Sequence, residues 1–446
     1  MPKEYPFIKV PPPGPKAREL LRKDRKYVSP SSGKVYPLMV KGASGAMVED
    51  VDGNRYLDFT AGIAVTSTGH CHPEVVKAIT RQSKELLHMS GADFYNPPQI
   101  ALAERLDAVC PGPSPKKVFF SNSGAESIEA AIKLTRHHTR RPYLLAFLNA
   151  FHGRTMGALS LTNSKPVLRK GFAPLMPGVV HVPYAECYRC AYGLTYPGCK
   201  IACVKWIEEE FFATHVHPEE VAAVFVEPIQ GEGGYIVPPK EFHQELKKLC
   251  KKYGILFVAD EVQSGMGRTG KMLAIEHFGV TPDVICLAKG IASGMPLGAT
   301  VAGGKIMDWP PGAHASTFGG NPVSCSAALA TIDLLKGGLI KNAAQMGDYI
   351  IKALHVISAT SRLIGDVRGK GLMIAVEMVT DKNTKKRAIE ERNKVVEGAF
   401  RKGLLLLDCG RNSIRFSPPL TITKKDADKA LAIFEETLRE VEKGMR

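Results

Sequence analysis

The sequence predicts an α/β fold in which a large, doubly wound, mainly parallel sheet is accompanied by a smaller α+β domain. Short apolar runs rich in β-branched residues alternate with amphipathic helix patterns between about residues 100 and 330. Long amphipathic helices follow residue 331, and a small strand meander occupies residues 38–60. We therefore expect residues 61–330 to form the large domain, and residues 1–60 and 331–446 to form the small one together.

The strands expected in the large domain are too short for buried helices. They cover residues 118–120, 144–148, 179–183, 221–226, 256–259, 284–287 and 299–302. Helices are expected between them, for example at 125–138 and 239–253. Strands that alternate with helices favour parallel neighbours joined by right-handed crossovers.

The small domain is expected to combine both ends of the chain. Asp52-Gly53-Asn54 is a hairpin turn signal within the N-terminal meander. The helices expected here cover residues 16–24, 342–357, 393–402 and 425–443, and the C-terminal strands cover 372–377 and 414–416.

Composition narrows the class of protein. The 446 residues carry a formal net charge of +15, but the Lys and Arg residues are dispersed among acidic ones, which argues against a nucleic-acid site. No apolar run approaches the roughly 20 residues of a membrane span, and residues 1–15 lack the apolar core of a secretory signal. We therefore expect a cytoplasmic enzyme without a membrane partner.

Two neighbouring strands are each followed by a charged side chain. Asp260 follows the apolar run 255–259, and Lys289 follows the run 284–288. Parallel strands carry their chemistry at their carboxyl ends, so one edge should present a carboxylate and an amine. This pair suits pyridoxal phosphate, which needs a lysine for its Schiff base and an acid beside its ring nitrogen. Either residue alone could equally be a buried ion pair or a solvated rim charge.

Other strand ends carry further polar motifs. Ser123 and Glu126 have the spacing of a helix capping box, and Gly124 between them lets a phosphate approach the helix N-terminus. A well-capped helix without a ligand explains the same residues. Phe151 and Arg154 follow another strand, where an aromatic ring can stack on a ligand and a guanidinium can clamp a carboxylate.

Taken together, seven stretches in order resemble the class III, ω-amino-acid group of fold-type I pyridoxal phosphate enzymes. They are Thr-Gly-His-Cys-His-Pro at 68–73, Ser-Gly-Ala-Glu at 123–126, Phe-His-Gly-Arg-Thr at 151–155, Glu-Pro-Ile-Gln-Gly-Glu-Gly-Gly at 227–234, Asp-Glu-Val-Gln-Ser-Gly at 260–265 with Gly-Arg-Thr-Gly at 267–270, Ala-Lys-Gly at 288–290, and Thr-Phe-Gly-Gly-Asn-Pro at 317–322. The matches extend from about residue 45 to residue 420.

The resemblance implies a cofactor site. It assigns Lys289 to the Schiff base and Asp260 to the pyridine nitrogen, and Thr317 reaches the phosphate of a neighbouring subunit, which implies a homodimer with shared active sites. The full set of cofactor-binding residues that it implies is Ser123, Gly124, Ala125, Phe151, His152, Glu227, Asp260, Val262, Gln263, Lys289 and Thr317.

The resemblance also implies a substrate site. Arg154 matches a clamp for a substrate carboxylate, Arg415 matches the α-carboxylate site of 2-oxoglutarate, and Glu232 pairs with that arginine when an ω-amine is bound. Ile63 replaces the Tyr of ornithine aminotransferases and favours 4-aminobutyrate or acetylornithine as the donor. Asp93, near the substrate mouth, could instead read the second ammonium of ornithine or lysine, or be a plain surface residue.

The implied reaction is transamination in two half-reactions, from an ω-amino acid to 2-oxoglutarate, with Lys289 as the base that moves the proton. The alternative is amino-acid racemisation or epimerisation on the same cofactor. Racemases of this family carry Asp at the position of Glu232, so Glu232 favours transamination.

An insertion contributes four clustered cysteines. Cys187 and Cys190 form a CxxC motif, and Cys199 and Cys203 are one helical turn apart. This spacing resembles a small structural zinc site, while two disulfides are an equally good explanation. Four reduced thiols are the remaining alternative.

Overall fold

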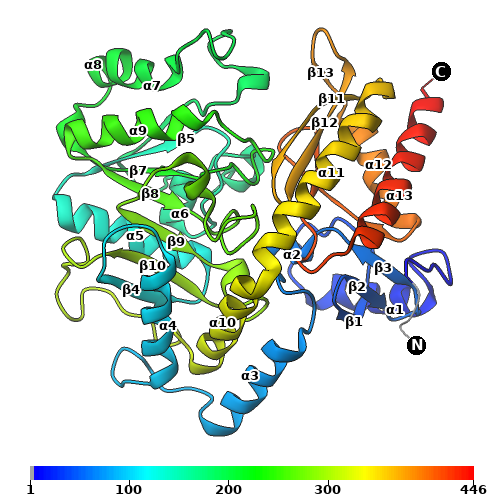
Figure 1. Ribbon diagram of the computed structural model, residues 1–446, viewed down its shortest axis with the longest axis horizontal. Coiled ribbons are helices and arrows are strands. Elements are labelled where there is room, and N and C mark those ends of the chain that lie inside the picture. Colours follow the sequence, from blue (N-terminus) through cyan, green and yellow to red (C-terminus); the bar gives the residue numbers. More distant parts are fainter. Residues whose placement is uncertain (1–4, 446) are drawn as a thin grey trace. The chain divides into compact units, whose positions relative to one another are not determined.

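The computed structural model describes residues 5–445, which fold as two compact units (Figure 1). The large unit is Pro73–Ile340, and the small unit combines the chain up to His72 with the chain from Lys341 onward. The unit boundaries lie somewhat later in the sequence than the expected residues 60 and 330.

The large unit is built on a seven-stranded sheet with the order β4-β10-β9-β8-β7-β5-β6. The strands are β4 (Lys116–Ser121), β5 (Tyr143–Phe147), β6 (Val179–Val182), β7 (Val221–Val226), β8 (Leu256–Asp260), β9 (Val284–Leu287) and β10 (Gly298–Gly303). Neighbours from β6 to β9 are parallel, whereas β10 is antiparallel to both β4 and β9. The predicted α/β fold with a mainly parallel sheet is confirmed.

Helices connect these strands, and burial explains why they form where they do. Helix α5 buries Ile128, Ala131 and Ile132 in a core that it shares with strands β5, β7 and β9. Its N-cap is Ser123, and helix α9 ends at Gly254 in a left-handed conformation that suits glycine. The helices of the large unit are α3 (Pro73–Glu85), α4 (Pro97–Val109), α5 (Gly124–Thr139), α6 (Met156–Leu161), η1 (Pro166–Leu168), η2 (Cys187–Arg189), α7 (Ala202–Trp206), η3 (Ile207–Phe211), α8 (Phe212–Thr214), η4 (Pro218–Glu220), α9 (Lys240–Tyr253), η5 (Ala274–Phe278), η6 (Lys289–Ile291), α10 (Pro322–Leu334) and η7 (Leu335–Leu339).

The small unit contains two sheets. The first has the order β1-β2-β3-β14, where β14 of the C-terminal segment runs parallel to β3 of the N-terminal segment. Tyr56, Phe400 and Leu405 form a core beneath this junction, so both chain ends build one domain as predicted. The second sheet has the order β11-β12-β16-β15, with β13 paired to β12. The elements are α1 (Pro15–Tyr27), β1 (Val40–Ser44), β2 (Met47–Asp50), β3 (Arg55–Asp58), α2 (Ala61–Ala64), α11 (Ile340–Thr360), β11 (Ile364–Lys370), β12 (Met373–Asp381), β13 (Lys386–Arg387), α12 (Ile389–Arg401), β14 (Leu404–Leu405), β15 (Leu407–Cys409), β16 (Ser413–Phe416) and α13 (Lys424–Lys443).

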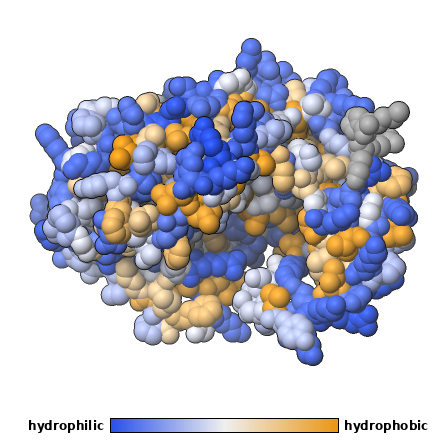
Figure 2. Space-filling view, turned by 90° about the horizontal axis from the view of Figure 1, so that it is seen from below, coloured by the Kyte–Doolittle hydropathy of each residue, from blue (hydrophilic) through white to orange (hydrophobic). Residues whose placement is uncertain are grey.

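The surface composition and one long apolar helical stretch bear on possible partners. Hydrophilic and hydrophobic residues are interspersed over the face shown in Figure 2. The helical stretch Pro322–Thr360 is long and apolar enough to cross a membrane by length and composition. Half of its most apolar window is buried within the structure, and a core helix has the same properties.

Candidate active site

The carboxyl ends of β8 and β9 carry the two residues predicted to hold the chemistry. Asp260 is the last residue of β8 and pairs in register with Cys286 of β9, and Lys289 follows the end of β9 in the short helix η6. Lys289 has a φ of 46°, in the left-handed region that non-glycine residues rarely adopt. Such strain persists where surrounding structure imposes it and is concentrated at functional sites.

Asp260 is held by a buried histidine. Its Oδ2 lies 2.7 Å from His152 Nδ1, and its Oδ1 accepts a 3.0 Å hydrogen bond from the Val262 amide. Burial favours the neutral ring of His152, but the hydrogen bond to Asp260 and the charges of Asp260 and Glu227 outweigh it, so the pKa of His152 is raised. His152 and Asp260 therefore form a buried pair whose hydrogen bond favours the protonated form of the histidine.

Glu227 lies at the end of β7 and is the third ionisable group of this cluster. The amides of Phe151 and Gly231 donate to its two carboxylate oxygens at 3.0 and 2.8 Å. Burial raises the pKa of Glu227 to about 7, and the negative charge of Asp260 adds to the rise, while His152 and the two amides oppose it. Glu227 thereby connects the Phe151 loop to the turn that carries Glu232.

The predicted phosphate turn lies at the N-terminus of α5. Ser123 Oγ accepts a 3.2 Å hydrogen bond from the Glu126 amide, as the capping box predicts. The Glu126 carboxylate reaches one residue further back than predicted and accepts from the amide of Asn122 at 2.9 Å. A Cβ on Gly124 would lie 2.7 Å from Val262 Cγ1, so this turn packs closely against the segment after Asp260.

Gln263 is fixed by the turn that carries Glu232. Tyr235 Oη donates a 2.8 Å hydrogen bond to Gln263 Oε1. A Cβ on Gly231 would lie 2.4 Å from Gln263 Nε2, so only glycine fits at that position without a shift. The segments after β7 and β8 are thus interlocked.

The substrate-site candidates of the large unit lie in more open positions. Arg154 is exposed, and its Cζ lies 5.9 Å from the centre of the half-buried Phe151 ring. Glu232 forms an ion pair with Lys165, with Nζ and Oε1 2.7 Å apart. Asp93 and Thr317 are exposed.

Two further candidates belong to the small unit. Ile63 has a left-handed backbone conformation in α2 and a side chain that is 44% exposed. Arg415 is buried in β16, between Ala375 of β12 and Leu407 of β15. The pairing of Arg415 with Glu232 stays a prediction, as do the roles of both residues.

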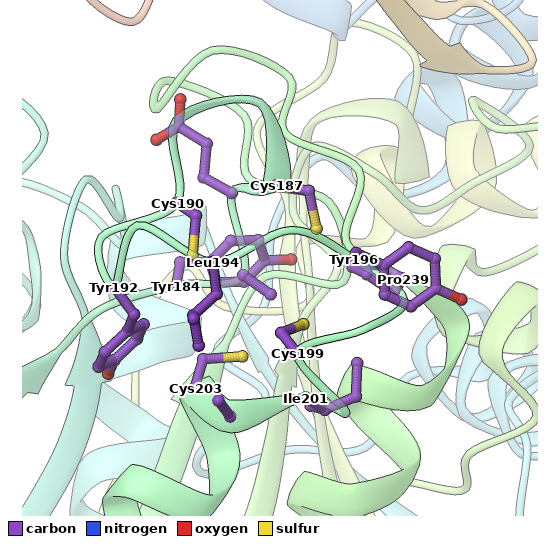
Figure 3. Close-up of a pocket in the computed structure, with 13 residues that line it drawn as sticks. Tyr184, Cys187, Cys190, Tyr192, Leu194, Tyr196, Cys199, Ile201, Cys203 and Pro239 are labelled. Atoms are coloured by element: carbon purple, nitrogen blue, oxygen red, sulfur yellow. The ribbon is translucent and has the colours of Figure 1, made fainter.

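The four cysteines of the insertion line one pocket of the large unit (Figure 3). Figure 3 shows the sulfur atoms of Cys187, Cys190, Cys199 and Cys203 pointing into the same space. Burial and the neighbouring thiols Cys199 and Cys190 raise the pKa of Cys187, and burial raises the pKa of Cys203 to about 12. The predicted convergence of these cysteines is therefore present.

The predicted chemical linkage of these cysteines is absent. All four are free thiols, so the two disulfides are not formed. Among residues 5–445, no group of three or more His, Cys, Asp or Glu side chains is arranged to hold a metal ion. The structural zinc predicted from the spacing therefore has no support, because converging on a pocket does not bring four sulfurs to the short distances of a zinc site.

His152, Glu227, Asp260 and Lys289 form the strand-end cluster, and its chemistry fits pyridoxal phosphate. The first amides of α5 have no intrahelical acceptors and can bind a phosphate. Asp260 is a carboxylate held by the buried ring of His152, and Lys289 supplies the amine. His152 Nε2 is buried without a hydrogen-bond partner within the described part of the chain, which leaves a polar atom for a bound group or a water molecule.

Sequence reasoning placed His152 in the cofactor site but missed its pairing with Asp260. It also missed the Lys165–Glu232 pair. The His152–Asp260 pair could have been predicted, since both residues follow strands that were expected to end at the same edge of the sheet. Lys165 lies in the loop between α6 and η1, where no pattern in the sequence indicates which carboxylate it meets.

Comparisons with known proteins show the family to which the chain is similar. The family model for class-III aminotransferases matches residues 27–438. An alanine/serine racemase of Pyrococcus horikoshii is 43% identical, with 99% of this chain and 94% of the relative covered. A 4-aminobutyrate aminotransferase of Mycobacterium leprae is 40% identical, with 96% of both chains covered. The crystal structure of an (S)-enantioselective ω-transaminase from Thermomicrobium roseum has a TM-score of 0.88 at 34% identity, covering 95% of this chain and 99% of that one.

Proposed function

Because the chain belongs to the class-III aminotransferase family, and is a transaminase by that membership, we propose that it transfers an amino group from an ω-amino acid to 2-oxoglutarate in two half-reactions. The donors that we propose are 4-aminobutyrate and the diamino acids ornithine and lysine. The observation that carries the proposal is the placement of Asp260 and Lys289 at one edge of the sheet, with Asp260 held by His152.

Pyridoxal phosphate, when bound, supplies an electron sink for the carbon that loses its proton. Asp260, paired with His152, would hold a proton at the ring nitrogen. The N-terminal amides of α5 would bind the phosphate, and the ring of Phe151 would stack on the cofactor. In the first half-reaction the amine of Lys289 would take the proton from the donor carbon that bears the amine and pass it to the aldehyde carbon of the cofactor, and in the second it would deliver a proton to the oxo carbon of the acceptor.

Charged side chains recognise the two ends of each substrate. Arg154 binds a carboxylate of the donor, and Arg415 binds the α-carboxylate of 2-oxoglutarate. Glu232 neutralises Arg415 while an ω-amine is bound, so that one site accepts two different substrates. Ile63 favours the uncharged chain of 4-aminobutyrate, whereas Asp93 favours a diamino acid.

Racemisation is the second candidate activity. Three relatives that cover most of the chain carry the names alanine/serine racemase, leucine/methionine racemase and isoleucine 2-epimerase, at 43%, 42% and 38% identity. Glu232 in place of the Asp of racemases in this family favours transfer. The substitution Glu232→Asp therefore tests whether this chain can be made to catalyse racemisation.

We also propose that the enzyme acts as a cytoplasmic homodimer. Thr317 is followed by Phe318, whose ring is 61% exposed and lies 4.9 Å from the ring of His88. Leu87 is 65% exposed beside them, since its carbonyl accepts a hydrogen bond from Asn321. An exposed apolar patch next to the predicted intersubunit residue supports a shared site. Light scattering on the holoenzyme measures the oligomeric state, and a monomer would contradict this proposal.

A donor screen tests the proposed reaction. The holoenzyme is incubated with 2-oxoglutarate and a panel of ω-amines and of D- and L-amino acids, and glutamate formation is measured. We expect glutamate from 4-aminobutyrate or from a diamino acid. Conversion of an L-amino acid to its D form without an acceptor, at rates above glutamate formation, would establish racemisation instead.

A further inference from the structure

Glu232 has a positively charged neighbour within its own unit. Lys165 Nζ lies 2.7 Å from Glu232 Oε1, and the two side chains are 34% and 19% exposed. Lys165 lies outside every motif that predicted the active site. The proposed function therefore assigns no role to this lysine.

The backbone fixes the approach of these two side chains. The amides of Asn163 and Ser164 donate to the Ala150 carbonyl at 3.0 and 3.1 Å, which anchors the segment before Lys165. On the other side, Gln230 Nε2 donates to the Leu148 carbonyl at 2.8 Å. Both segments are thus fastened to the same short stretch before Phe151, so the ion pair does not depend on two long side chains meeting by chance.

We propose that Lys165 is a specificity-determining residue that sets how much negative charge Glu232 presents to a bound substrate. The inference rests on the proposed function, because it takes Glu232 to face the substrate. An ammonium 2.7 Å from a carboxylate cancels most of the field of that carboxylate at a distance. With this ammonium beside it, Glu232 tolerates the α-carboxylate of 2-oxoglutarate, whereas without the ammonium it repels that carboxylate and attracts an ammonium group.

The test compares steady-state constants of Lys165→Met with those of the wild-type holoenzyme. We expect the KM for 2-oxoglutarate to rise roughly fivefold and the KM for ornithine or lysine to fall by a similar factor. A change of this size corresponds to the loss of one partly exposed ion pair. The kcat should change little, because Lys165 does not touch the reacting atoms. Added salt should shrink both shifts, since it screens partly exposed charges. Lys165→Arg should behave as the wild type.

Two controls separate charge from structure. Lys170→Met removes an exposed lysine from the same segment and should leave both KM values unchanged. In a Glu232→Gln background, Lys165→Met should have no further effect. Calorimetric titration with glutarate, a dicarboxylate that lacks the amino and oxo groups, should show a similar loss of affinity in Lys165→Met without any turnover.

The outcomes distinguish this inference from the proposed function. If the wild-type enzyme forms no glutamate from any ω-amine, the proposed function fails, and the glutarate titration still decides on Lys165. If the wild type transfers the amine but Lys165→Met matches Lys170→Met in KM values and glutarate affinity, the inference is wrong. An undiminished effect of Lys165→Met in the Glu232→Gln background would also overturn it, because the lysine would then act without its carboxylate.

Discussion

The strand-end cluster and the cysteine pocket are two groups of ionisable side chains in the same unit, and they are held in different ways. At the strand ends, Asp260 and Glu227 each accept one hydrogen bond from the segment after β5 and one from an amide of their own segment. In the insertion, four thiols point into one pocket but are joined neither by disulfides nor by a metal arrangement. Convergence of side chains alone is therefore not a functional site; partners that fix each atom are also needed.

The largest effect is expected at Asp260. Asp260→Asn removes the charge that keeps a proton on the ring nitrogen and leaves His152 without its anion. We expect kcat/KM to fall by roughly 10²–10⁴-fold, as for loss of an acid–base group. Asp348→Asn, at an exposed position, serves as the control. Activity within a few fold of the wild type would show that Asp260 does not act on the cofactor.

His152→Asn keeps a hydrogen-bond donor for Asp260 but removes the positive charge. Asp260 then lacks its charged partner, so we expect kcat/KM to fall by about tenfold at neutral pH. His243→Asn is a matched control, because burial lowers the pKa of His243 to about 4 and the ring carries no charge at neutral pH. A similar loss of kcat/KM in the control would remove the special role of His152.

Much of the fold and part of the site follow from local sequence patterns. The runs at 221–226 and 284–287 match β7 and β9 in full, because strands buried on both faces are continuous apolar runs. Asp260 and Lys289 follow directly from the ends of such strands. The convergence of the four cysteines followed from their spacing, but the Lys165–Glu232 pair could not be predicted, because it depends on how two loop segments pack against each other, which no short pattern encodes.

Protonation of Glu227 makes the stability of the fold depend on pH. Its pKa of about 7 in the fold lies above the ordinary value of 4.5, so its contribution to stability is complete below pH 4.5 and is lost as the pH rises through 7. Glu227→Gln mispairs one of the two amide donors and should lower the melting temperature at every pH. The difference from the wild type should shrink between pH 5 and pH 8. Thermal melts over this range, with the exposed Glu220→Gln as control, measure it. A difference that stays constant over this range would show that Glu227 is ionised throughout it.

The smallest effect is expected at the cysteine pocket. Oxidation by a small disulfide compound should join thiols of the 187–190 and 199–203 segments, and closing loops of this size should raise the melting temperature by a few degrees. The absorbance of the bound cofactor should not change, because none of the predicted cofactor residues belongs to the insertion. Cys187→Ser should abolish part of the shift, whereas Cys71→Ser in the small unit should not.

Thiol titration and elemental analysis complete this comparison. Four thiols that still titrate after oxidation, or bound zinc in the isolated protein, would show that the pocket behaves differently from a pair of oxidisable segments. A change in the cofactor spectrum on oxidation would mean that the two regions are coupled.

The most direct test of the account is the identity of the lysine that carries the cofactor. Borohydride reduction of the holoenzyme fixes pyridoxal phosphate on that lysine, and peptide mapping by mass spectrometry locates it. We expect a single tagged peptide containing Lys289, the residue in a left-handed conformation after β9. A tag on any other lysine, Lys165 included, or no tag at all, would contradict the assignment of the active site to the ends of β8 and β9.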